Sequence, residues 1–312
     1  MPELPEVEIV CRGLSQLVVG KKIAGVTHDW DKSFPNAAQD VNKFLIGEQI
    51  KYIRRRAKVL LIDLSTEYTL VIHLKMTGQL VYVRQAAQER GLTIVKRGED
   101  RLQVMSEVER FGAGHPNDSL TGELPDKSTR VTVVFSDNSK LFFNDQRKFG
   151  WVKLVQSHEV ESLKFMQTVG PEPLATDFTA KDFNNRLMKR PNTTIKAALL
   201  DQTVIAGVGN IYADESLWGA KIHPLTFVKN VSKLKLNKLY EELRYVLNLA
   251  IEKGGSTDRN YVNAEGKKGS YLSFARVFRR ENQPCPRCST TIIKTRVAGR
   301  GTHTCPNCQR SN

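Results

Sequence analysis

The first six residues, MPELPE, carry the most reactive groups of the chain. If the initiator methionine is removed, Pro2 becomes the N-terminus. An α-amino group titrates near pH ~8, so a sizeable fraction is uncharged and nucleophilic at neutral pH. Amines attack sugar carbons and form Schiff bases, and two carboxylates, Glu3 and Glu6, lie within one turn of this amine. The alternative is a plain helix start, because Pro and Glu both suit a first turn. The hexapeptide by itself leaves both interpretations open.

Four of the five cysteines form two pairs near the C-terminus, Cys285 with Cys288 and Cys305 with Cys308. Each pair has the spacing of a zinc knuckle, and the segment between the pairs is long enough for a hairpin. Four thiolates make a closed site, so the sequence predicts one structural zinc ion. Two disulfides are the alternative, which a reducing compartment disfavours. We expect Cys11 to be a small buried residue of the first helix.

A glycine-rich turn, Gly207-Val208-Gly209-Asn210, leads into a predicted helix. Backbone N–H groups at a helix N-terminus can bind a phosphate oxygen. The turn lacks the preceding strand of a dinucleotide-binding fold, which excludes that class. A tight connection between two helices is the alternative.

Cations gather in three further segments. In the cysteine-rich segment, Arg300 lies between two glycines, as at the tip of a hairpin. Arginine-rich hairpins held by a metal are common in nucleic-acid binding. Residues 54–58 read RRRAK and enter a strand, and residues 144–150 read NDQRKFG, which places an aromatic ring beside cations in a turn. The alternatives are a solvated charged face and a phenylalanine of the core.

Helical and strand patterns indicate how these groups are positioned. Apolar residues at helical spacing predict a helix over residues 3–18. Short β-branched runs at 58–64, 69–74 and 130–135, with a turn at 136–139 leading to 140–143, predict an antiparallel sandwich or barrel. The stretch from 85 to 125 is polar and charged. We expect it to be a partly disordered insertion, with a possible hairpin near residue 99, and either idle or an extra contact surface.

A Gly-Pro-Glu-Pro sequence at 170–173 marks a domain boundary. Helical segments follow at 183–188, 194–200, 211–218 and 234–253, and a glycine-rich polar loop spans 254–269.

The overall composition favours a polyanionic partner. The chain has 312 residues, 40% of them hydrophobic, and a formal net charge of +14. Nucleic acid is the first candidate for such a partner. No run is apolar enough to span a bilayer, and the N-terminus lacks a secretory pattern, so we expect a cytosolic protein.

These motifs occur together in the bacterial formamidopyrimidine-DNA glycosylases, which the chain resembles over nearly its full length apart from residues 85–125. The matching stretches are MPELPEVE (1–8), RRAKVLL (55–61), HLKMTGQL (73–80), RKFG (147–150), GPEPL (170–174), IKAALLDQTVIAGVGNIYADESLW (195–218), IHP (222–224), GGST (254–257) and VAGRGTHTCPNCQ (297–309). The chain departs from the family pattern at 127–130, where KSTR replaces KHDH, and at Ala197, where many members have proline.

The resemblance implies an α+β multidomain fold in three parts. An N-terminal catalytic antiparallel β-sandwich with flanking helices would span residues 1–155. A helical helix-two-turn-helix domain that binds DNA would span 156–275 and include a lesion-covering loop at 254–269. A zinc-bound β-hairpin would span 276–312.

The resemblance also implies an activity, that of a base-excision repair enzyme. Such an enzyme flips a damaged nucleotide out of double-stranded DNA and removes oxidised purines, chiefly 8-oxoguanine and formamidopyrimidines. The Pro2 nitrogen would attack C1′ of the deoxyribose and form an iminium, and β- and δ-elimination would follow as an abasic-site (AP) lyase reaction. Glu3 would act as general acid and base, and Glu6 would orient the N-terminus or relay protons.

The remaining site residues follow from matching positions of the family. Lys58 would contact the phosphate beside the lesion, and four more residues would grip phosphates, namely His73, Lys196, Asn210 and Arg300. Three residues would fill the void left by the extruded base, namely Met76, Arg147 and Phe149.

Two rival functions and several partners complete the expectations. The sister endonuclease VIII-like enzymes remove oxidised pyrimidines but typically start MPEGPE, so Leu4 favours the purine branch. A non-catalytic protein that binds damaged DNA is disfavoured by the intact Pro2, Glu3 and Lys58. The resemblance implies a monomer that binds duplexes with oxidised bases or abasic sites, in the bacterial cytoplasm and at the nucleoid while acting.

Overall fold

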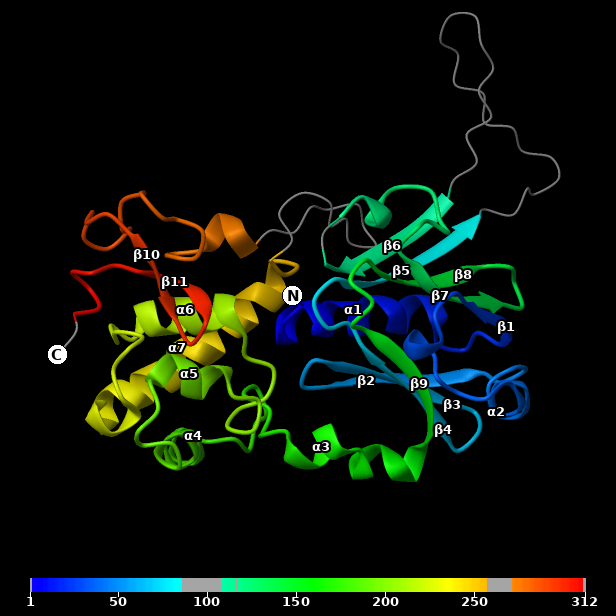
Figure 1. Ribbon diagram of the computed structural model, residues 1–312, viewed down its shortest axis with the longest axis horizontal. Coiled ribbons are helices and arrows are strands. Elements are labelled where there is room, and N and C mark those ends of the chain that lie inside the picture. The colour runs from blue at the N-terminus through cyan, green and yellow to red at the C-terminus, as the bar shows by residue number, and fades with distance from the viewer. Residues whose placement is uncertain (1, 86–107, 116, 257–270, 311–312) are drawn as a thin grey trace, which may run out of the picture.

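The computed structural model describes residues 2–85, 108–115, 117–256 and 271–310. Figure 1 shows two halves side by side, one built of β-sheets and one of helices, with the N-terminus between them. A small hairpin near the C-terminus lies on the helical half. In the described part of the chain, no helix is long and apolar enough to cross a membrane.

The sheet half is a sandwich of two antiparallel sheets. One sheet has the strand order β1-β7-β8-β5-β6, and the other has the order β2-β3-β4-β9. The first sheet consists of β1 (Ile23–His28), β7 (Thr129–Phe135), β8 (Lys140–Asp145), β5 (Gly78–Gln85) and β6 (Val108–Gly114). The second consists of β2 (Ile50–Arg56), β3 (Val59–Leu64), β4 (Tyr68–His73) and β9 (Trp151–Gln156). The side chains between the sheets form the larger hydrophobic core.

Helix α1 (Leu4–Val18) packs into this core. Its apolar residues recur at helical spacing, and Val7, Val10 and Leu14 are fully buried. The helix starts with the Glu6 carboxylate accepting the N–H of Glu3 at 2.8 Å, which satisfies a backbone donor that has no partner within the helix. A side chain at Gly13 would overlap the ring of Phe111, since a Cβ there would lie 2.1 Å from the ring. The helix therefore approaches β6 closely.

Strand β6 lies within the stretch that we expected to be an insertion. It pairs with β5 along its whole length, and Phe111 and Ala113 are buried against the core. Its apolar residues are few and stand among charged ones, so the alternation is too short to predict a strand. The hairpin that we considered near residue 99 lies outside the described residues.

Three short segments connect the halves or cover the sheets. They are α2 (Ala38–Phe44), a 3-10 segment (Ser157–Ser162) and α3 (Lys164–Thr168).

The arginines of the 54–56 run, at the end of β2, are paired with carboxylates. Arg54 binds Asp63, and Arg55 and Arg56 both bind Glu172 of the linker between the halves. This basic run therefore stabilises the fold and fixes the linker.

The helical half contains α4 (Ala180–Met188), α5 (Ile195–Leu200), α6 (Asn210–Gly219) and α7 (Lys233–Glu252) around a second core. The C-terminal hairpin consists of β10 (Ile293–Val297) and β11 (Arg300–Thr304). Its turn residues, Ala298 and Gly299, both have positive φ, as a tight hairpin turn requires. The predicted fold class is confirmed: an antiparallel sandwich, a helical domain and a hairpin beside the cysteine pairs.

Candidate active site

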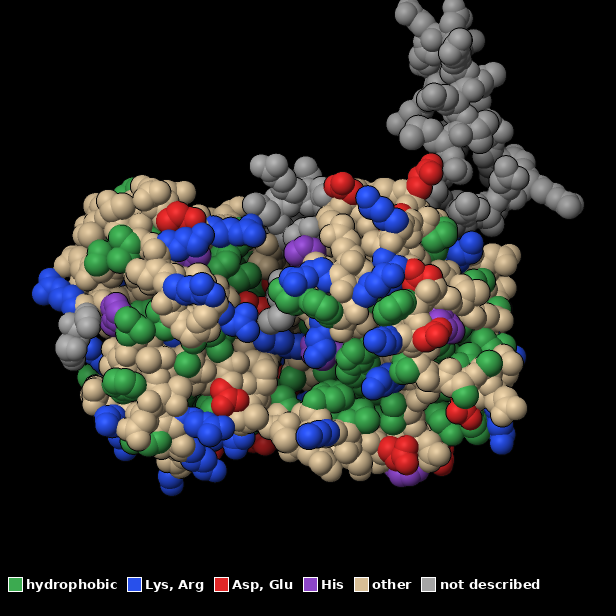
Figure 2. Space-filling view, viewed as in Figure 1, with side chains coloured by type: hydrophobic (Ala, Val, Ile, Leu, Met, Phe, Trp, Pro, Cys, Tyr) green, Lys and Arg blue, Asp and Glu red, His purple; other side chains and the backbone are tan. Residues whose placement is uncertain are grey.

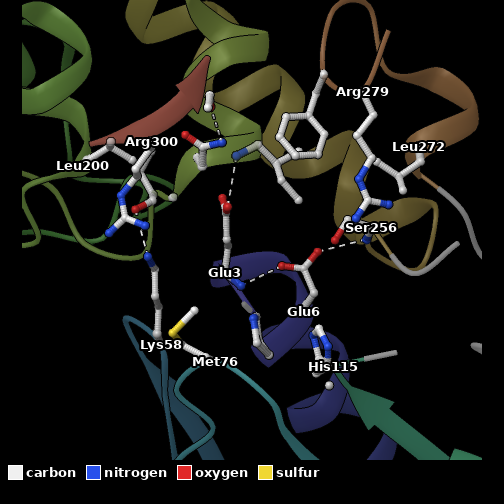
Figure 3. Close-up of a pocket in the computed structure, with 18 of the residues that line it drawn as sticks. Glu3, Glu6, Lys58, Met76, His115, Leu200, Ser256, Leu272, Arg279 and Arg300 are labelled. Carbon is white, nitrogen blue, oxygen red and sulfur yellow. Dashed lines mark hydrogen bonds between the residues drawn. The ribbon is translucent and has the colours of Figure 1, made fainter. Parts of the chain in front are cut away.

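A cavity of about 450 Å³ lies where the two halves and the hairpin meet. Figure 3 shows Glu3 and Glu6 extending into it from the start of α1, with Lys58 from the sheet half and Arg300 from the hairpin. Seven of the predicted site residues line the cavity, namely Pro2, Glu3, Glu6, Lys58, Met76, Asn210 and Arg300.

Two hydrogen bonds donated by backbone N–H groups hold Pro2 at the wall of this cavity. The N–H of Glu3 donates to Glu6 Oε2 at 2.8 Å, and the N–H of Leu4 donates to the carbonyl of Gly207 at 3.0 Å. The chain is thus fixed on both the α1 side and the α6 side directly after Pro2. An amine at this position would be held in place without a flexible side chain.

Glu3 is a buried carboxyl with one bonded and one free oxygen. Its Oε1 accepts the N–H of Ile211 at 3.0 Å, and its Oε2 has no partner among the described residues. Burial raises the pKa of Glu3 to about 7, against the opposing charge of Lys58. A Cβ at Gly209 would lie 2.3 Å from the Glu3 carboxyl carbon, which explains the glycine. The N-terminus of α6, expected to bind a phosphate oxygen, therefore holds a carboxyl of the chain at Ile211.

Glu6 has both of its carboxylate oxygens engaged. In addition to the N–H of Glu3, it accepts the hydroxyl of Tyr212 at 2.7 Å and the N–H of Ser256 at 2.9 Å. These bonds join α1 to α6 and to the segment after α7. Glu6 is thus suited to positioning the N-terminus, one of the two roles that we expected.

Lys58 lies on the sheet side of the cavity, and His73 lies in a neighbouring groove that Lys58 also lines. The ammonium of Lys58 donates to the carbonyl of Val208 at 2.9 Å, and burial lowers its pKa. Burial also lowers the pKa of His73 to about 3, so this imidazole is neutral. Its Nδ1 accepts the N–H of Lys75 at 3.1 Å, which places the ring proton on Nε2. His73 can therefore donate to a phosphate without carrying charge.

Asn210 and Arg300 form the opposite wall. The amide of Asn210 donates to the carbonyl of Gly301 at 2.9 Å, which ties the start of α6 to the hairpin. Arg300 is exposed next to the hairpin turn and faces the cavity. Its charge is close enough to that of Lys58 to lower the pKa of the lysine. Two cations on facing walls make this cavity attractive to an anion.

Lys196 does not lie on the cavity wall, where its predicted phosphate contact would require it. Its side chain is completely buried. The ammonium donates to Asp214 Oδ1 at 2.6 Å and to Thr302 Oγ1 at 2.6 Å. Because Asp214 neutralises its charge away from solvent, a phosphate cannot reach it. Lys196 instead joins α5 and α6 to the β11 strand of the hairpin.

Met76, Arg147 and Phe149 form one exposed cluster, which we call the exposed trio. Met76 is 38% exposed and Phe149 is 52% exposed. The Arg147 guanidinium lies 4.9 Å from the centre of the Phe149 ring and donates to the Met76 sulfur at 3.3 Å. The trio therefore presents two apolar wedges beside a cation.

The four paired cysteines converge at the base of the hairpin. Their sulfur atoms all lie within 4.8 Å of one another, which fits thiolates at zinc distances. The indole of Trp218 donates to the sulfur of Cys285 at 3.4 Å, an outer contact that orients a ligand. The donor set and its closed geometry confirm the prediction of one structural zinc ion, with all four ligands supplied by the chain.

The structure adds residues that the sequence did not single out. His115 and Arg279 line the cavity, and Tyr212 and Ser256 bind Glu6. Tyr212 and Ser256 belong to stretches used for the resemblance, which was the available signal. His115 follows β6, the strand that was not predicted. Of the predicted lesion-covering loop, residues 257–269 lie outside the described residues.

Comparisons with known proteins agree with this geometry. A model of the formamidopyrimidine-DNA glycosylase N-terminal domain matches residues 1–152, and one of the H2TH domain of the same enzymes matches residues 169–261. A zinc finger found in FPG and IleRS matches residues 282–310.

Full-length relatives extend the match. A formamidopyrimidine-DNA glycosylase of Streptococcus mutans is 38% identical and covers 99% of this chain and 100% of its own length. One of Chloroflexus aurantiacus is 39% identical, with 99% and 98% covered. A crystal structure of a Lactococcus lactis FPG mutant in complex with a Fapy-dG containing DNA matches with a TM-score of 0.81 at 32% identity, covering 99% of this chain and 100% of that chain.

Proposed function

Since the chain belongs to the formamidopyrimidine-DNA glycosylase family, we propose that its central cavity carries out base excision with Pro2 as the nucleophile. The protein is a DNA base-excision repair enzyme for oxidised purines and a bifunctional glycosylase and AP lyase. The observation that carries the assignment is the meeting of Pro2, Glu3 and Lys58 in one cavity beside an exposed trio.

The reaction begins once Met1 has been removed. The uncharged Pro2 nitrogen attacks C1′ of the damaged nucleotide, and the glycosidic bond breaks with its electron pair on the departing base, which takes up a proton. Opening of the sugar ring then gives an iminium between Pro2 and C1′. The iminium draws electrons from C2′, so that loss of a proton expels the 3′ phosphate, and a second elimination expels the 5′ phosphate. Water then hydrolyses the iminium, which releases the unsaturated sugar aldehyde and restores the Pro2 amine, and a one-nucleotide gap remains.

Glu3 is placed to move the protons of these steps. Its raised pKa, about 7, makes both the acid and the carboxylate available near neutral pH. Its free Oε2 is the atom that can give a proton to the sugar ring oxygen and take one back. Glu6, whose oxygens are all bonded, keeps the N-terminus aligned rather than exchanging protons.

The cations around the cavity bind the phosphates that flank the extruded nucleotide. Lys58 and Arg300 provide charge from facing walls, and Asn210 provides an N–H donor. His73, in the groove that shares Lys58, provides a second neutral donor. Charged donors make the stronger hydrogen bonds to phosphate, and neutral donors fix its orientation. Together they hold the sugar within reach of Pro2.

The exposed trio fills the space that the extruded base leaves. Met76 and Phe149 can insert between base pairs as apolar wedges. Arg147, held against both, can hydrogen-bond the unpaired cytosine on the opposite strand. The wedge role explains why the apolar side chains of Met76 and Phe149 remain exposed in the free protein.

The zinc ion serves the same cavity indirectly. When bound, it cross-links the two cysteine pairs and so stiffens a hairpin too small to have a core of its own. The hairpin positions Arg300 and, through Gly301, Asn210. Removal of the metal should therefore weaken DNA binding before it affects the sheet half.

Three further assignments rest on family resemblance and are also proposals. We place the domain boundaries near residues 155 and 275, and we expect a monomer. The protein should act in the cytoplasm at the bacterial nucleoid. A fluorescent fusion that stays away from the DNA of the cell, before and after oxidative damage, would contradict that location.

Duplex cleavage tests the proposed function directly. With 8-oxoguanine opposite cytosine, we expect base release and a gap with phosphate at both ends. Glu3→Gln should lose base release, whereas Glu109→Gln, which removes an exposed carboxylate on β6 outside the cavity, should not. Preferential cleavage at thymine glycol would favour the pyrimidine branch. Binding without cleavage of either duplex would indicate a non-catalytic protein.

A further inference from the structure

A second groove begins on the far side of Lys58. It has a volume of about 550 Å³ and lies between β9, α3 and the loop after α5. We call it the β9–α3 groove. Lys58 lines both this groove and the central cavity, and His73 lines the groove. A strand of DNA held at Lys58 therefore lies at the entrance to the groove.

The floor of the groove contains two aromatic rings in fixed positions. Trp151 contacts His73 edge to face, with ring centres 5.9 Å apart, and contacts Phe165 in the same way at 5.7 Å. Both aromatic side chains are only half-buried, and they pack on a small core beneath α3. The rings therefore form a rigid apolar row that leads from the phosphate-binding His73 towards α3.

Three lysines border this row. They are Lys75, Lys153 and Lys164, and none of them forms an ion pair with a carboxylate among the described residues. The ammonium of Lys153 lies 4.9 Å from the centre of the Trp151 ring. Figure 2 shows blue and green side chains together in the lower middle of this face, between the two halves. Cations without carboxylate partners beside an apolar wall are suited to a sugar–phosphate backbone.

We propose that the β9–α3 groove binds the sugar–phosphate backbone of the damaged strand on one side of the lesion. The lysines contact successive phosphates, and Trp151 and Phe165 pack against the deoxyribose between them. The proposal rests on the proposed function, because Lys58 must hold the phosphate next to the lesion. Contacts of this kind carry no sequence information. They add affinity and register without entering the chemistry.

The test compares two charge-matched double variants of the full-length, zinc-loaded protein. Lys153→Ala/Lys164→Ala removes two groove cations. Lys43→Ala/Lys235→Ala removes two exposed lysines of α2 and α7 that line neither the cavity nor the groove. The probe is a fluorescent duplex with a tetrahydrofuran abasic analogue opposite cytosine. Three duplexes are used. One has long flanks on both sides of the analogue, one has only two nucleotides of the damaged strand on its 5′ side, and one has only two on its 3′ side.

The groove variant should bind the full duplex at least tenfold more weakly than wild type. The slope of log affinity against log salt should be less steep by about 2, since each phosphate that the variant no longer neutralises reduces the slope by about one unit. The difference from wild type should vanish on one shortened duplex and persist on the other. Single-turnover cleavage at saturating enzyme should stay unchanged.

Equal losses of affinity in both double variants, or a weaker affinity that persists on both shortened duplexes, would overturn the groove assignment. A slower reaction at saturating enzyme would do so too. Failure of the underlying function is distinguishable, because the wild-type protein would then show no cleavage of an 8-oxoguanine duplex. In that case the two variants would have no activity to preserve.

Discussion

The buried pair of Lys196 and Asp214 gives the sharpest prediction about how the hairpin is held. Both side chains are completely excluded from solvent, and the ammonium also donates to Thr302 in the hairpin. Lys196→Met keeps the length of the side chain but leaves the Asp214 carboxylate buried without its cation. The other contact of that carboxylate is with His303, whose backbone N–H donates to Oδ2 at 3.0 Å.

The expected cost follows from breaking such a pair. Removing one member of a buried ion pair costs about 3–5 kcal/mol, since the remaining charge is uncompensated. For the helical half with its hairpin, this loss of free energy of unfolding corresponds to a fall in Tm on the order of 10 °C. Replacing both members, in Lys196→Met/Asp214→Leu, should recover most of the stability. Lys189→Met, at an exposed lysine in the same half, should change Tm little.

Thermal unfolding followed by tryptophan fluorescence measures these differences, and DNA binding at several salt concentrations completes the assay. If Lys196 contacted a phosphate instead, the variant would keep its Tm and its salt slope would fall by about one unit. That result would refute the assignment of Lys196 as a brace between α5, α6 and the hairpin.

Three other perturbations test separate parts of the site. Because the pKa of Glu3 is raised from 4.5 to about 7, its contribution to stability is present below pH 4.5 and is lost as pH rises through 7. Glu3→Gln should therefore be more stable than wild type above pH 7, by up to about 3 kcal/mol. A difference between the two proteins that is the same in denaturant titrations at pH 5 and at pH 9 would contradict this. Elemental analysis should find one zinc per chain. Cys305→Ser should lose the metal and bind DNA more weakly, because the hairpin that carries Arg300 loses its cross-link, whereas Cys11→Ser should keep both the metal and the affinity. A metal-free protein with full DNA affinity would exclude the structural role. Phe149→Ala and Met76→Ala should each weaken binding to a lesion duplex by about 1–3 kcal/mol, as expected when a side chain that unstacks or stacks on bases is removed. Tm should stay unchanged, because both side chains are exposed. A fall in Tm with unchanged binding would show that they serve the core.

The sequence predicted much of this architecture because its patterns are local. Apolar spacing indicated α1, and β-branched runs indicated β3, β4 and β7 within a few residues of their observed bounds. The spacing of the cysteines indicated a zinc site for the same reason. Strand β6 was missed, because its place in the sheet depends on burial of Phe111 against α1, a contact between distant segments.

The site shows the same division between local and distant information. The identity of Pro2 and Glu3 was readable, but the raised pKa of Glu3 depends on burial under α6, which no local pattern gives. Lys196 matched a family position, yet its role is decided by Asp214 and Thr302, which fold around it. Arg55 and Arg56 likewise form a basic run in the sequence, but both are paired with Glu172 of the distant linker.

The central claim is that the Pro2 nitrogen forms the covalent bond to DNA, and borohydride trapping followed by peptide mapping tests it most directly. After reaction with an 8-oxoguanine duplex, reduction and trypsin digestion, the nucleotide adduct should be on the peptide from Pro2 to Arg12. Protein that retains Met1 should give no adduct. An adduct on a peptide that contains Lys58, or an undiminished adduct with Met1 in place, would contradict the account.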